Sequence, residues 1–92
     1  MNQQKSSSRP PRIELNHDAV LIDDMSGEHE VVLLDVSQAG FRLATNELFE
    51  PGERLVLRSG RSPDTRIEIR WHRGREAGGV FIDPPPVFAE KS

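Results

Sequence analysis

Short alternations of apolar and polar residues, each ended by a turn signal, run along most of this 92-residue chain. The clearest alternation is at 66–72, where Ile67, Ile69 and Trp71 alternate with charged or polar residues. A period of two is typical of strands with one buried face, because successive side chains on a strand point to opposite sides. No segment has a 3.6-residue period over three turns. The pattern therefore predicts an all-β chain with at most short helical turns.

Six strands are expected, separated by turn sequences rich in Gly, Pro, Asp and Ser. They cover residues 13–22, 31–36, 41–43, 55–57, 67–71 and 80–82, with a possible helical turn from Asn46 and a break over 74–79. Six short strands at about ten-residue spacing predict a barrel or a sandwich. We divide the chain into a flexible N-terminal arm (1–12), a β-barrel (13–83) and a Pro-rich C-terminal tail (84–92).

Composition excludes several classes of function. The net charge of -3 argues against a general nucleic-acid-binding protein, which needs a basic excess to attract phosphates. There is no cysteine, and the three histidines lack ligand-like spacing, so no metal site or other cofactor is expected. The chain has neither a long apolar run nor the apolar core of a secretory signal, which predicts a cytoplasmic protein without membrane insertion.

No catalytic arrangement is evident. Ser37 has no neighbouring His or Lys to activate it and no Gly-x-Ser-x-Gly elbow around it. No glycine-rich phosphate-binding loop of the common types is present. We therefore expect a binding protein and not an enzyme.

The segment Asp35-Val36-Ser37-Gln38-Ala39-Gly40 stands between two apolar runs. Asp35 and Ser37 are two residues apart, so on a strand their side chains point to the same side and combine an acceptor with a hydroxyl. We expect Asp35 to be an acceptor on the barrel surface, although a local turn that closes a strand would also explain the pair. Gly40 allows a turn, or the close approach of a ligand or another strand.

Two arginines precede the first expected strand, in the Ser- and Pro-rich sequence Ser7-Ser8-Arg9-Pro10-Pro11-Arg12. Guanidinium groups bind phosphates through paired hydrogen bonds and can stack on flat bases. A solvated tail would have the same composition. An arginine arm followed by Asp-x-Ser-x-x-Gly resembles the PilZ domain family, small six-stranded antiparallel barrels that bind the bacterial messenger cyclic di-GMP.

The resemblance implies a site for this ligand. Arg9 and Arg12 would bind its two phosphates, and the Asp35, Ser37 and Gly40 motif would bind a guanine edge. Trp71 is a candidate for stacking on a base, although its phase with Ile67 and Ile69 favours the core. Arg42, like most arginines of the expected strands, is interpreted as a solvated strand residue.

The arm departs from the family pattern Arg-x-x-x-Arg, because Ser8 stands at the first position if Arg12 is the second. Three hypotheses follow. The chain is a cyclic di-GMP receptor that relays the signal to a partner protein, such as a motility, polysaccharide or enzyme component. Alternatively, it is a PilZ-like adaptor that acts through protein contacts without nucleotide. A small barrel that binds single-stranded nucleic acid by stacking is the third.

Overall fold

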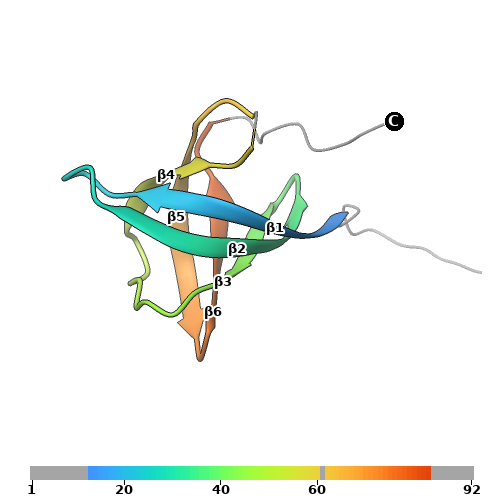
Figure 1. The fold of residues 1–92 in the computed structure, drawn as a ribbon. Coiled ribbons are helices and arrows are strands. Elements are labelled where there is room, and N and C mark those ends of the chain that lie inside the picture. Colours follow the sequence, from blue (N-terminus) through green and yellow to red (C-terminus); the bar gives the residue numbers. More distant parts are fainter. Residues whose placement is uncertain (1–12, 61, 84–92) are drawn as a thin grey trace, which may run out of the picture.

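The computed structural model describes residues 13–60 and 62–83, and this part of the chain forms six strands and no helix (Figure 1). The expected arm and tail, with Ser8, Arg9 and Arg12, lie outside the described residues. The strands are β1 (Ile13–Ile22), β2 (Glu28–Ser37), β3 (Gly40–Ala44), β4 (Arg54–Arg58), β5 (Thr65–Arg73) and β6 (Glu76–Phe81).

The strands close into one antiparallel barrel in the order β1-β2-β3-β6-β5-β4, with β4 pairing back onto β1. In Figure 1, β1 and β2 cross the view while β5 and β6 run nearly perpendicular to them. All six strand pairs are antiparallel. The prediction of a six-stranded antiparallel barrel is therefore confirmed. Closure removes the unpaired edges that a small open sheet would expose.

The barrel interior is filled by aliphatic side chains from every strand. Six of them are almost completely buried, and Phe41 and Phe49 add aromatic rings to the same cluster. Burial of one such side chain stabilises the fold by about 1.5–3 kcal/mol relative to leaving it exposed. The six are Leu21, Leu33, Leu43, Leu57, Ile67 and Ile69.

The β5–β6 connection is tighter than the sequence pattern indicated. We expected a break over 74–79, but β6 begins at Glu76 and the connecting turn is short, with Gly74 at a φ of 61°. Gly78 and Gly79 lie inside β6, where residues of the neighbouring strand β5 pack against them. A Cβ on Gly79 would collide with the carbonyl oxygen of Glu68 on β5. Their lack of a side chain therefore serves close packing and not a turn.

The β3–β4 loop, residues 45–53, is irregular, and the helical turn that we considered from Asn46 does not form. The Thr45 side chain accepts a hydrogen bond from the Glu47 amide at 3.0 Å. Phe49 is buried in the core, and the Gly52 amide donates to the carbonyl oxygen of Ile69 at 2.7 Å. One aromatic anchor and backbone bonds to β5 thus fix the loop against the barrel.

Three of the strands carry irregularities in their pairing. The register shifts between Glu14 and His17 in β1, between Leu33 and Asp35 in β2, and between Ile69 and Trp71 in β5. In β1 the irregularity includes Asn16, whose φ is 53°. A bulge adds a residue on one strand and re-aims the side chains beside it. All three lie next to the residues described below.

Candidate functional site

Strand register aligns five residues across the outer wall of the barrel. Glu14 on β1 pairs with Asp35 on β2, Asp35 pairs with Arg42 on β3, Arg42 with Gly78 on β6, and Gly78 with Trp71 on β5. We call these five residues the cross-strand row. Paired residues of antiparallel strands share a face. The row contains two of the residues predicted for the site, Asp35 and Trp71.

Asp35 is buried, and its carboxylate is bound by Arg42. The Nε and Nη2 atoms of Arg42 both lie 2.9 Å from Oδ2 of Asp35. The residue is only 3% exposed, which is wrong for the acceptor on the barrel surface that the sequence led us to expect. A buried carboxylate needs such a partner, because desolvation of an unpaired charge is costly. The pairing of Asp35 with Arg42 across the β2–β3 hairpin brings the two side chains together.

Arg42 links Asp35 to a second carboxylate. Its Nη1 atom lies 3.1 Å from Oε1 of Glu76 on β6. Hydrogen bonding to Asp35, together with the charge of that carboxylate, raises the pKa of Arg42 above its ordinary value. The guanidinium is 42% exposed, so it is held between the two acids while one part still faces solvent. The three groups form a fixed chain of charges on the site wall.

Ser37 ends β2 at a two-residue turn formed by Gln38 and Ala39. Its Oγ accepts a hydrogen bond from the Ala39 amide at 3.1 Å. This is the local turn that we considered for the motif serine. A hydroxyl that accepts one hydrogen bond can still donate another. Ser37 therefore has a turn role in the described structure and keeps the chemistry needed for a donor.

Gly40 begins β3 and pairs with Ser37 across the turn. A Cβ at this position would collide with the carbonyl oxygen of Gly79 on β6. The close approach of another strand, one of the two uses predicted for this glycine, is therefore what the structure shows. Because backbone lies there and not a flexible side chain, any larger residue would force β3 away from β6.

The indole of Trp71 lies over Gly78, on the same outer face as Arg42. A Cβ on Gly78 would come within 2.5–2.6 Å of three atoms of the ring. The register shift at Arg70 changes the phase of β5, so Trp71 is half-buried outside the barrel while Ile69 is fully inside. The core interpretation of Trp71 is therefore wrong. The Arg73 guanidinium lies 5.9 Å from the ring centroid, within the range of cation–π contact.

Carboxylates outnumber guanidiniums in the cross-strand row. Glu14 and Asp35 are acidic, and Arg42, the one cation of the row, is already paired with Asp35 and with Glu76 beside it. Such a surface does not attract a dianion by itself. Binding of phosphates here would need cations from another part of the chain. Arg9 and Arg12, the predicted source, lie outside the described residues.

Sequence reasoning missed Arg42 and Glu76. The signal for Arg42 was present, because a two-residue turn at Gln38 and Ala39 pairs 37 with 40 and therefore 35 with 42. Hairpin register thus places an arginine opposite the motif aspartate. Glu76 could be found only through the β3–β6 pairing, which joins segments far apart in the chain.

Other kinds of site were also considered. Within residues 13–60 and 62–83, no group of His, Asp and Glu side chains is arranged to hold a metal ion. The same residues contain no helix long and apolar enough to cross a membrane. These observations concern only the part of the chain that the structure describes.

Comparison with models of known protein families gives a match over most of the chain. The model of the PilZ domain family matches residues 4–89, nearly the whole chain. The matched segment includes the arm arginines, the Asp35 to Gly40 hairpin and all six strands. No curated protein matches the chain.

Proposed function

The chain belongs to the PilZ domain family, a family of cyclic di-GMP-binding receptor modules, and we propose that it binds this dinucleotide and relays its presence to a partner protein. PilZ domains are binding or adaptor modules and not enzymes. The proposal assigns the ligand to the outer wall of the barrel, at the cross-strand row and the Ser37–Gly40 hairpin.

The observation that carries the proposal is the position of the motif hairpin beside a half-buried aromatic ring on the outer face of the barrel. Register brings Asp35 and Trp71 onto one face, with Arg42 and Gly78 between them. Gly78 has no side chain, so the indole can lie along the wall. A flat surface next to hydrogen-bonding groups suits a purine, whose faces stack and whose edge carries donors and acceptors.

Each group has a distinct role in the proposed complex. The guanine N1 and N2 hydrogens need an acceptor, and we assign that role to the carboxylate of Asp35, which Arg42 holds through Oδ2. Ser37 donates to the opposite part of the base edge. Trp71 stacks on a base. Arg42 holds the Asp35 carboxylate in place and is therefore a positioning residue.

The phosphates are assigned to the arm. Because the cross-strand row carries two carboxylates and one guanidinium, we assign the neutralisation of the two phosphates to Arg9 and Arg12. Ordering of the arm over the site would then change the surface that a partner meets. The arm is thus both the source of affinity and the moving part of the proposed relay.

A nucleotide-free adaptor is the second candidate. Asp35 is already bound by Arg42, so the motif has a structural role that needs no ligand. Ser8, at the position of the first family arginine, also favours this alternative. Under it, the hairpin would be retained for folding, and partner contacts alone would carry the function.

Titration followed by Trp71 fluorescence separates these possibilities. Trp71 is the only tryptophan, so the emission reports on the proposed site alone. We expect cyclic di-GMP to change the emission saturably at micromolar concentration, while GMP and a short single-stranded DNA have little effect. No response to cyclic di-GMP in fluorescence or in calorimetry would favour the adaptor, and a stronger response to the DNA would favour a nucleic-acid-binding barrel.

A further inference from the structure

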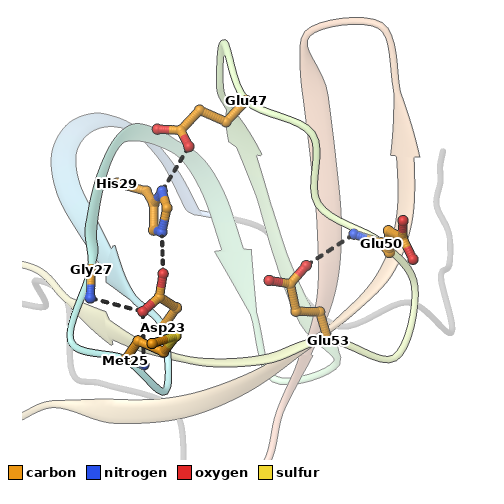
Figure 2. Close-up of polar contacts among 7 residues, drawn as sticks. All are labelled: Asp23, Met25, Gly27, His29, Glu47, Glu50 and Glu53. Carbon is orange, nitrogen blue, oxygen red and sulfur yellow. Dashed lines mark hydrogen bonds and ion pairs between the residues drawn. The ribbon is translucent and has the colours of Figure 1, made fainter.

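His29, near the start of β2, lies between two carboxylates from different loops (Figure 2). Its Nε2 atom is 2.8 Å from Oδ2 of Asp23 in the β1–β2 turn. Its Nδ1 atom is 2.7 Å from Oε1 of Glu47 in the β3–β4 loop. One imidazole ring therefore bridges two segments that are more than 20 residues apart in sequence and share no strand pairing.

The bridge needs a charged ring. Both carboxylates are acceptors, and only the imidazolium form carries hydrogen on both nitrogens. The neutral ring donates to one carboxylate and presents a lone pair to the other, which repels it. Hydrogen bonds to Asp23 and then Glu47 raise the pKa of His29 above its ordinary 6.5. The charged state is therefore the one that the surroundings favour.

The two carboxylates are held unequally. Asp23 also accepts hydrogen bonds from the Met25 and Gly27 amides at 2.9 and 2.8 Å, so the turn fixes it (Figure 2). The hydrogen bond to His29 is the main cause that lowers the pKa of Asp23. The side chain of Glu47 is 48% exposed, and its carboxylate contacts His29. Unlike Asp23, it is not fixed by backbone amides of its own loop within the described residues.

Neighbouring groups do not substitute for the ring. On β5, His72 contacts the carbonyl oxygen of Glu47 at 3.1 Å, and a carbonyl accepts a hydrogen bond whether that imidazole is neutral or charged. The Phe49 ring packs edge-on against His29 with centroids 5.6 Å apart and carries no charge. Glu28 and Glu30, the neighbours of His29 on β2, point to the other face of the strand.

We propose that His29 is a pH-dependent clip between the β1–β2 turn and the β3–β4 loop, closed when the ring is charged and opened on the Glu47 side when it is neutral. Asp23 keeps the remaining hydrogen bond, because the turn fixes its carboxylate. The Glu47 backbone stays attached to β5 through His72, while the side chain is released. The clip stands apart from the cross-strand row and does not depend on nucleotide binding.

The pH range of the clip follows from the directions of the pKa shifts. The pKa of His29 is raised, so its stabilising contribution is complete below 6.5 and is lost as the pH rises through the higher value in the folded protein. The pKa of Asp23 is lowered from 3.8, so its contribution is lost only in stronger acid. The clip is closed between these limits and opens toward alkaline pH.

NMR titration of the histidine ring protons tests the proposal directly. In the wild type, we expect the midpoint of His29 to lie above 6.5, with the amide signals of 46–48 shifting at the same midpoint. Glu47→Gln should lower that midpoint, and Asp23→Asn should lower it further. Glu53→Gln is the matched control, because that carboxylate accepts a hydrogen bond from the Glu50 amide in the same loop (Figure 2).

Three results would overturn the proposal, and the first two need no mutation. A wild-type His29 midpoint at or below 6.5 would show that the ring is not held as a cation. A raised midpoint without a matching shift of the 46–48 amides would show that protonation is not coupled to the loop. A Glu53→Gln effect as large as that of Glu47→Gln would attribute the shift to general charge and not to the clip.

Discussion

Trp71 and Gly78 form a pair in which one residue requires the other to have no side chain. A Cβ on Gly78 would lie 2.5 Å from two ring carbons of the indole, well inside van der Waals distance. The ring position on the outer wall therefore depends on a glycine in the next strand. This relationship places an aromatic surface beside Arg42 and the motif hairpin.

Gly78→Ala should displace the indole and weaken cyclic di-GMP binding. In a Trp71→Ala background the same change should not destabilise the fold. There it should raise the free energy of unfolding by about 0.5–1 kcal/mol, because glycine is unfavourable inside a strand. A double-mutant cycle of urea unfolding measures this coupling. Equal effects of Gly78→Ala in both backgrounds would contradict the contact.

Arg42→Ala should destabilise the barrel, because it removes the guanidinium that binds the buried carboxylate of Asp35. Breaking a fully buried ion pair lowers the free energy of unfolding by about 3–5 kcal/mol. Because the Arg42 side chain is partly exposed, we expect a smaller loss of about 1–3 kcal/mol. Arg54→Ala is the control, since Arg54 is 73% exposed and pairs with Glu68 at 3.3 Å. It should cost less than about 1 kcal/mol. Urea unfolding measures both losses. Equal losses for the two variants would show that the Arg42–Asp35 pair stabilises the fold no more than an exposed ion pair does.

Asp83→Asn should lower the melting temperature more at pH 6 than at pH 2. Asp83 follows β6 and binds Arg66 on β5 through both side-chain oxygens, with the shortest contact at 2.8 Å. The hydrogen bond from Arg66 lowers the pKa of Asp83 from 3.8. A lowered pKa contributes stability above 3.8 that disappears as the carboxylate is protonated in acid. Thermal unfolding at both pH values checks this, and a loss of melting temperature at pH 2 as large as the loss at pH 6 would contradict it.

Ser8→Arg should tighten cyclic di-GMP binding and steepen its salt dependence, because it restores the family spacing with Arg12 and adds a cation for a phosphate. Calorimetry at two salt concentrations measures both effects. If the wild type does not bind and this variant does, the adaptor hypothesis is correct. No change in the variant, together with loss of binding in Arg9→Ala, would show that the offset arm works as it stands.

The fold was predictable because strand alternation and turn residues are local signals, as the agreement over 13–22 and 67–71 shows. The bulges were not, since an added residue such as Arg70 is compatible with any strand sequence and only the pairing partner reveals it. This one shift changed Trp71 from an expected core residue to a wall residue. The burial of Asp35 likewise depends on Arg42, which three-dimensional pairing brings into contact.

Calorimetric titration of the full chain with cyclic di-GMP tests the central claim most directly. We predict saturable binding by the wild type, weakened about one to two decades by Arg12→Ala, as expected for loss of a charge-assisted hydrogen bond of about 1.5–3 kcal/mol. Arg9→Ala should cost no more than Arg12→Ala. Arg58→Ala removes a guanidinium that pairs with Asp64 at the end of β4, a strand outside the cross-strand row, and should bind like the wild type. Absence of binding heat at tens of micromolar cyclic di-GMP, in both the wild type and Ser8→Arg, would contradict the assignment of this chain as a cyclic di-GMP receptor.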